Sequence, residues 1–319
     1  MTLSKRIVCG LWLFGCGGCA AFGWLQVPVD PAATHPIPPF TIPAAREGVA
    51  YERFIVIGDQ GSGGPGQKKV AAVMAARARK DGLNFWITTG DNFYQAGVSS
   101  VDDPQWKTKF EEMYADPALK VPVYPSLGNH DHDGNEAAQV EYASRNPLWK
   151  MPGQYYTFPR TLSDGTKIQF FVIDSDPIVA GAQDIGTQLT WLDAELGKSD
   201  ARWKLVYGHH PLYGHNPARG HNEAMKEHVG PLLVKHKVDA FFAGHDHCLE
   251  MIKPVGGVHH VISGAASGED RPYAVNWTEE SYYAATMGGF VFCRVSKDEL
   301  VIEFVRLNGE MQYAHVLTK

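Results

Sequence analysis

Cysteine is scarce in this chain of 319 residues, and most of it lies near one end. Of the five cysteines, Cys9, Cys16 and Cys19 fall in an apolar stretch near the amino terminus, which leaves only Cys248 and Cys293 further along. Two cysteines are too few for a disulfide framework or for the thiolate pairs of a zinc finger. They could form one disulfide or remain two buried thiols.

Concentrated positive charge is also lacking, because the formal net charge is −6 and no basic run is longer than Lys68-Lys69. A protein that binds nucleic acid by neutralising phosphates needs such a run or patch, so we expect no nucleic-acid binding. The chain contains neither a GxSxG nucleophile elbow nor a CxxxxxR loop built on a cysteine. The sequence therefore offers no motif for catalysis through a nucleophile of the protein itself.

The amino-terminal part differs in composition from the rest. A basic start precedes an apolar stretch over residues 7–25, and proline-rich sequence without periodicity follows. We predict an export signal or a membrane or lipid anchor in residues 1–26, a proline-rich linker in residues 27–49 and one folded domain in residues 50–319. A cleaved signal would place the protein in the periplasm or outside the cell, whereas a retained one would tie it to a membrane.

Short apolar strands alternate with helical segments in the first half of this domain. The pattern predicts strands over residues 53–57, 85–89 and 121–127, and helices over residues 67–80 and 104–114. Such a βαβαβ order implies a parallel sheet with right-handed crossovers, which brings the carboxyl ends of the three strands to one edge.

The second half repeats this pattern and then continues with strands alone. We predict further strands over 155–158, 167–173, 204–207, 240–243, 259–263, 290–295, 300–306 and 312–316, and helices over 188–196 and 223–236. The two halves suggest two sheets that pack face to face.

Five predicted strands each end in glycine followed by a side chain that can bind a metal. These side chains are Asp59, Asp91, Asn129, His209 and the pair His245 and His247. Taken singly, each has an ordinary explanation, such as a helix cap, a turn residue or a core histidine. In this ordered combination, carboxylate, amide and imidazole groups, together with the phenol of Tyr94, form a ligand set suited to two hard-to-borderline cations.

The motifs GDQG, GDNFY, GNHDH, GHHP and GHDH resemble those of the metallophosphoesterase superfamily. The tyrosine of GDNFY is similar to that of the purple acid phosphatase branch, and Tyr142, Trp149 and residues 154–156 resemble the small tartrate-resistant acid phosphatases. The resemblance covers residues 50–317. It implies an α/β fold, a four-layer α/β/β/α sandwich with two mixed sheets face to face, and a catalytic domain over residues 50–319.

Carried over residue by residue, the resemblance implies a binuclear metal centre. It assigns a ferric ion to Asp59, Asp91, Tyr94 and His247. It assigns a divalent iron, zinc or manganese ion to Asp91, Asn129, His209 and His245. Asp91 would bridge the two ions.

The resemblance also implies residues that act on the substrate. His130 matches a histidine that contacts the phosphate and protonates the leaving group, and a further histidine follows the fourth motif. His215 and His221 are both candidates for that further histidine, and spacing favours His221; either one could equally be an exposed loop residue. Gln60 and His210 depart from the family pattern, and neither is expected to be a ligand.

The implied reaction is hydrolysis of phosphate monoesters, by attack of a metal-activated hydroxide, in a monomer acting on small-molecule or protein phosphoesters. Asp91 and Asn129 would take part in catalysis through the metals, beside His130 and His221. A phosphodiesterase or nucleotide hydrolase with the same metals is the alternative. A metal-binding module without catalysis is a third possibility, against which the full set of ligands speaks.

Overall fold

The computed structural model describes residue 40, residues 42–268 and residues 275–319. The predicted signal or anchor in residues 1–26 and much of the predicted linker lie outside the described residues. Within them, no helix is both long and apolar enough to cross a membrane. Cys248 and Cys293 are both free and buried, so they remain thiols rather than a disulfide.

The first sheet has six strands in the order β13-β12-β11-β1-β2-β3. Its members are β1 (Glu52–Ile57), β2 (Phe85–Thr89), β3 (Val123–Ser126), β11 (Gly289–Val295), β12 (Glu299–Arg306) and β13 (Met311–Thr318). β1, β2 and β3 run parallel, with Ile57 opposite Thr88 and Thr89 opposite Ser126. The three strands therefore end level with one another, as the βαβαβ pattern predicts.

The second sheet has seven strands in the order β10-β8-β9-β7-β6-β5-β4. Its members are β4 (Tyr156–Thr161), β5 (Lys167–Val172), β6 (Trp203–Tyr207), β7 (Ala240–Ala243), β8 (Leu249–Val255), β9 (Val258–Ser263) and β10 (Ser281–Ala285). Neither β8 nor β10 was among the predicted strands. β8 and β9 are joined at Gly256-Gly257, where both residues have positive φ, and this glycine pair is a hairpin signal that could have revealed β8.

Aromatic side chains fill the space between the two sheets. The ring of Phe54 on β1 lies 5.3 Å from that of Phe170 on β5 and 6.2 Å from that of Phe242 on β7. Phe85 on β2 also lies 5.3 Å from Phe170. Edge-to-face pairs of this kind add to the free energy gained by burying the rings. The two sheets pack face to face, as predicted.

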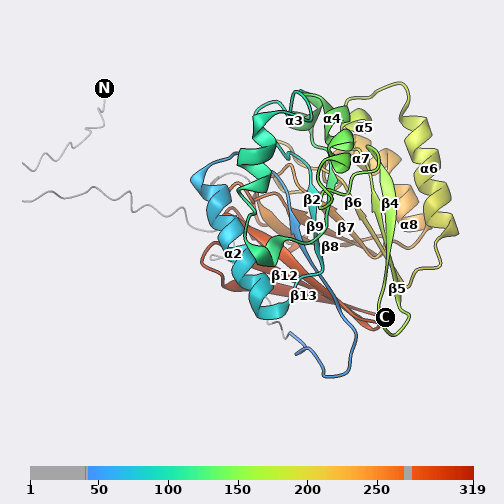
Figure 1. The fold of residues 1–319 in the computed structure, drawn as a ribbon. Helices are drawn as coiled ribbons and strands as arrows, with labels where there is room; N and C mark the ends of the chain where they lie inside the picture. The colour runs from blue at the N-terminus through green and yellow to red at the C-terminus, as the bar shows by residue number, and fades with distance from the viewer. Residues whose placement is uncertain (1–39, 41, 269–274) are drawn as a thin grey trace, which may run out of the picture.

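Helices cover the outer face of each sheet (Figure 1). α2 (Pro65–Asp81) lies against the first sheet, where Arg77 lies over the ring of Phe292 and pairs with Glu303 at 2.7 Å. α6 (Ile185–Lys198), α7 (Glu223–His228) and α8 (Gly230–Lys235) cover the second sheet, and their apolar side chains form a core cluster with those of β5, β6 and β7. These layers confirm the α/β/β/α sandwich.

Two helix predictions need correction. The helix predicted over residues 104–114 begins at residue 104 as predicted, but it becomes a π-helix over Trp106–Glu111 and ends there, three residues early. The helix predicted over residues 223–236 is split into α7 and α8, because Pro231 has no N–H to donate to the preceding turn. The remaining short helices are α3 (Asn129–His132), α4 (Glu136–Glu141), α5 (Asp176–Val179) and the 3₁₀ turns Pro117–Leu119 and Tyr142–Ser144.

Candidate metal centre

The carboxyl ends of five strands meet at one edge of the sandwich. The residues that follow β1, β2, β3, β6 and β7 are Asp59, Asp91, Asn129, His209 and the pair His245 and His247. The N–H of Asp59 donates to the carbonyl of Gly90 at 3.0 Å, and the N–H of Gly244 donates to the carbonyl of His209 at 2.9 Å. These two contacts each lie within one sheet. A further contact joins the two sheets, because the N–H of His245 donates to Oδ2 of Asp59 at 2.8 Å.

Three of the predicted ligands have left-handed backbones. The φ angles are 57° at Asp59, 52° at Asp91 and 65° at His245. Residues other than glycine adopt this region at a cost, and such residues gather at functional sites. The shared conformation turns each side chain sharply away from the end of its strand and into the common space.

Two of the glycines that precede these residues are required by close packing. A Cβ atom at Gly90 would lie 2.6 Å from Nδ1 of His209, and one at Gly128 would lie 2.3 Å from Oδ1 of Asp91. Gly90 also has φ of +87°. A side chain at either position would therefore displace a predicted ligand.

The first ligand cluster consists of Asp59, Tyr94 and His247. The hydroxyl of Tyr94 donates to Oδ1 of Asp59 at 3.1 Å and to Oδ2 of Asp91 at 2.9 Å, and lies 3.3 Å from Nε2 of His247. Nε2 of His247 lies 3.4 Å from Oδ1 of Asp59. Burial, followed by the charges of Asp59 and Asp91, raises the pKa of Tyr94 above its usual value.

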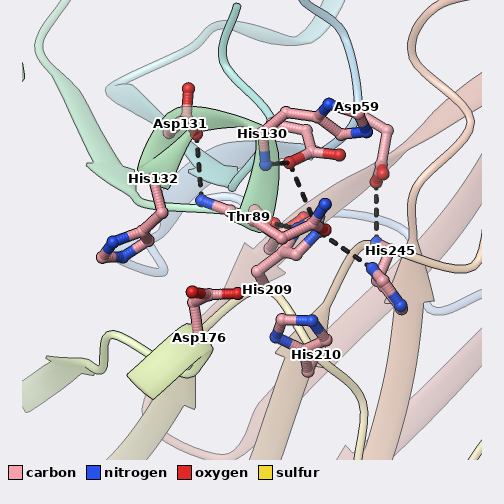
Figure 2. Close-up of polar contacts among 12 residues, drawn as sticks. Asp59, Thr89, His130, Asp131, His132, Asp176, His209, His210 and His245 are labelled. Atoms are coloured by element: carbon pink, nitrogen blue, oxygen red, sulfur yellow. Dashed lines mark hydrogen bonds and ion pairs between the residues drawn. The ribbon is translucent and has the colours of Figure 1, made fainter. Parts of the chain in front are cut away.

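The second ligand cluster consists of Asn129, His209 and His245. Nε2 of His209 lies 3.1 Å from Oδ1 of Asn129 and 3.1 Å from Nδ1 of His245. Its other nitrogen, Nδ1, lies 2.8 Å from the carbonyl oxygen of Thr89, to which it donates, so Nε2 is the nitrogen left for a ligand role. Figure 2 shows His209 and His245 pointing toward each other, with Asp59 above His245.

Asp91 lies between the two clusters. Its Oδ2 accepts from Tyr94 at 2.9 Å, while its Oδ1 lies 3.4 Å from Nε2 of His209 and accepts the N–H of His130 at 3.1 Å. The two oxygens of one carboxylate thus face different clusters, which is the arrangement that a bridging ligand needs.

These donors fit two cations. Asp59, Asp91 and His247 offer ligand atoms within 4.8 Å of one another. Burial, and then the charge of Asp91, raises the pKa of Asp59 well above its usual value, because a buried carboxylate faces a second carboxylate. Burial and the neighbouring histidines lower the pKa of His245, which keeps its imidazole neutral. Bound cations would offset the repulsion between the carboxylates, and the neutral imidazole nitrogens would coordinate them.

His210 lies closer to the centre than the sequence analysis suggested. It forms a third group of possible ligand atoms with His209 and His245, and its ring centroid lies 4.3 Å from that of His245. Nδ1 of His210 contacts Oγ of Ser175 at 2.9 Å. Burial, and then the charge of His209, lowers the pKa of His210 to about 2, so this histidine is neutral beside the second ligand cluster.

A cleft of about 510 Å³ opens over the first ligand cluster. Within the described part of the chain, its lining comprises Ser62, Tyr94, Gln95, Lys109, His130, Arg219, His247 and Ser267. His130 was predicted to face the substrate, and it lies in this lining with its Nδ1 against the carbonyl oxygen of Gln95. Lys109 and Arg219 in this lining were not predicted, because no sequence motif identifies them.

His221 does not lie with these residues. Neither His215 nor His221 belongs to the lining of the cleft; both contact Glu280 instead, at 2.9 Å from Nε2 of His215 and 3.7 Å from Nε2 of His221. The residue between them in the chain that does reach the cleft is Arg219.

Asp131 holds two of the ligand loops together and was not singled out from the sequence. Its Oδ2 accepts the N–H of Gly128 at 2.9 Å and that of Asn92 at 3.0 Å, and its Oδ1 accepts from the side chain of Gln139 at 2.8 Å. Burial raises the pKa of Asp131 to about 7. The carboxylate therefore fixes Asp91 and Asn129 through the residues beside them.

Comparison with known proteins agrees with this geometry. Residues 52–249 match the model of the calcineurin-like phosphoesterase family. The chain is 29% identical to tartrate-resistant acid phosphatase type 5 of Oryctolagus cuniculus, covering 87% of this chain and 94% of that protein. It is 31% identical to purple acid phosphatase 4 of Arabidopsis thaliana, covering 80% of each.

Two solved structures are similar over most of the chain. One is described as GAP50, the anchor in the inner membrane complex of Plasmodium, with a TM-score of 0.77, 25% identity, and coverage of 84% of this chain and 89% of that one. The other is purple acid phosphatase PPD1 from yellow lupin seeds, with a TM-score of 0.66, 17% identity, and coverage of 85% and 54%. The second likeness concerns the fold alone.

Proposed function

The chain belongs to the calcineurin-like phosphoesterases and, among them, to the purple acid phosphatases, and from this premise we propose that it hydrolyses phosphate monoesters at a centre of two metal ions. The observation that carries the proposal is the position of Asp91, whose two oxygens face different ligand clusters. A carboxylate placed in this way would join two cations into one centre.

Asp59, Tyr94 and His247 would hold the first ion, a ferric ion, together with Asp91. Asn129, His209 and His245 would hold the second, a divalent ion, together with the same aspartate. When bound, such ions polarise phosphate oxygens and lower the pKa of a bound water, so that it can act as a nucleophile near neutral pH.

The cleft supplies the groups that would bind the substrate. Arg219 and Lys109 contribute two basic side chains to its lining, and His130 also lies in this lining. The Nδ1 of His130 donates to the carbonyl oxygen of Gln95, so Nε2 is the nitrogen that faces the substrate, and it can give a proton to the departing oxygen when the ring is an imidazolium. Arg219 can bind two phosphate oxygens at once through its planar guanidinium.

A substrate panel with the full-length chain tests the proposal. We expect protein loaded with iron and zinc to hydrolyse p-nitrophenyl phosphate faster than bis-p-nitrophenyl phosphate, and chelation to remove both activities. Faster hydrolysis of the diester would instead identify a phosphodiesterase. If metal-loaded protein hydrolyses neither ester, the proposal is contradicted. A binding role would then be favoured, as for the Plasmodium protein, which is described as an anchor.

A further inference from the structure

A second group of metal-capable side chains lies outside the cleft. His215, His221 and Glu280 offer ligand atoms within 4.8 Å of one another. The two histidines belong to the loop between β6 and α7, and Glu280 directly precedes β10. We propose that these three residues bind a divalent cation of borderline softness, such as Zn²⁺, at a site separate from the binuclear centre.

The distances suit a tetrahedral ion. Nε2 of His215 lies 2.9 Å from Oε2 of Glu280, and Nε2 of His221 lies 3.7 Å from the same oxygen. Ligand atoms about 2.05 Å from a zinc ion in tetrahedral geometry are separated by roughly 3.3 Å, between these two values. Two imidazoles and one carboxylate with an open fourth position form a common zinc ligand set.

The second nitrogen of each histidine supports the same assignment. Nδ1 of His215 lies 2.6 Å from Oε1 of Glu250, a fully buried carboxylate that also accepts from Oγ of Ser281. Nδ1 of His221 lies 3.1 Å from the carbonyl oxygen of Gly214 and 3.3 Å from the backbone nitrogen of the same residue, so the contact with the carbonyl oxygen is the shorter. Histidines that bind metals almost always donate their other N–H to a carboxylate or a carbonyl, which leaves Nε2 unprotonated toward the ion.

The negative charges on both sides of His215 favour a cation at this position. Its ring lies between the carboxylates of Glu250 and Glu280, and Glu250 is buried without an arginine or lysine among its hydrogen-bonding partners in the described residues. The same carboxylates raise the pKa of His215 to about 9 against the opposing effect of burial, so a proton can also supply the charge. The site therefore holds either a protonated His215 or a metal ion, and experiment can separate the two.

A bound ion would fix the loop that carries Arg219 into the cleft. Arg219 lies between the two histidines in sequence, and the loop is also tied to the strand side by the N–H of Asn276, which donates to the carbonyl of His215 at 2.9 Å. Joining His215 and His221 to Glu280 would close this loop at both ends. The proposed site is thus structural, and it does not depend on the chemistry of the binuclear centre.

Zinc binding by matched variants tests the proposal. Full-length protein is dialysed against Zn²⁺ alone, and bound zinc per chain is measured for the wild type, Glu280→Gln and Glu279→Gln. Glu279 is exposed and adjacent, so its variant controls for the loss of charge. We expect Glu280→Gln to lose one zinc per chain, or to bind it at least about tenfold more weakly, while Glu279→Gln equals the wild type.

His221→Ala compared with His228→Ala repeats the test on the imidazole side. Asp91→Ala, which alters the binuclear centre, should keep the zinc that Glu280→Gln loses, so failure at one site is distinguishable from failure at the other. Circular dichroism confirms that each variant is folded; should His221→Ala not fold, Glu280→Gln decides alone, since its side chain is exposed. Equal zinc binding by Glu280→Gln and the wild type would overturn the proposal, as would equal losses in the two glutamate variants.

Discussion

Replacement of Arg219 tests whether the cleft binds the substrate phosphate as its lining suggests. Arg219 is anchored by the carbonyl oxygen of His245 and lies 3.4 Å from Oδ1 of Asp246. A guanidinium carries five N–H donors, so these contacts leave donors for a phosphate oxygen in the cleft. Arg219→Ala should therefore weaken binding of the monoester in both its ground and transition states.

The size of the effect follows from the bond that is lost. A hydrogen bond to a charged group contributes about 1.5–3 kcal/mol. Since about 1.4 kcal/mol corresponds to a factor of ten, kcat/KM should fall by about 10- to 150-fold. Burial raises the pKa of Asp246 to about 7, so below that pH its carboxyl is protonated and loses little when Arg219 is removed.

Steady-state kinetics with p-nitrophenyl phosphate at acid pH measures this effect. Arg219→Lys should recover part of the loss, because it keeps the charge but not the forked geometry. Arg145→Ala is the matched control, because Arg145 is exposed and its one ion pair among the described residues is weak, with Nη2 3.8 Å from Oδ1 of the exposed Asp102. A loss in Arg219→Ala no larger than in Arg145→Ala would refute the assigned role.

Three further outcomes are expected. His130→Ala should keep both metals but lower turnover more for alkyl than for phenolic phosphates, because acid assistance matters most for a basic leaving group; equal losses in a leaving-group series would remove that role. Tyr94→Phe should abolish a visible charge-transfer band of the iron-loaded protein while the chain stays folded, and a spectrum unchanged from the wild type would exclude a phenolate ligand. Burial lowers the pKa of His132, but the hydrogen bond to Asp174 and the charge of that carboxylate outweigh it and raise the pKa to about 9. The protonated pair therefore stabilises the fold below about pH 6.5, and this stabilisation is lost as the pH rises toward 9. Denaturant unfolding should show a decrease of about 1–2 kcal/mol over that window in the wild type and not in His132→Ala, and parallel pH profiles would contradict it.

The strands and the ligand positions at their ends could be predicted because one physical cause determines both. β1, β2, β6 and β7 are buried almost throughout, so each reads as an apolar run that stops abruptly at glycine. Parallel strands must end at the same edge, and this brings their polar successors together without any knowledge of the loops. The face-to-face packing of the sheets follows from the same apolar runs.

The loops could not be predicted in this way. Arg219 reaches the cleft from a loop whose conformation depends on contacts with Asp246 and the chain near Asn276, which lie far away in sequence. Spacing alone favoured His221 for the substrate side, but the fold directs it toward Glu280. The role of Asp131 was also hidden, because an aspartate in GNHDH resembles a turn residue until its buried partners are known.

The number of metals bound by Asp91→Ala tests the central claim most directly. Metal content per chain is measured for the wild type, Asp91→Ala and the control Asp102→Ala, which changes an exposed aspartate. Because Asp91 faces both ligand clusters, we predict that Asp91→Ala loses two metal ions per chain together with phosphatase activity, whereas Asn129→Ala weakens one and Asp102→Ala none. Wild-type metal content in folded Asp91→Ala, whatever its activity, would contradict the bridging centre.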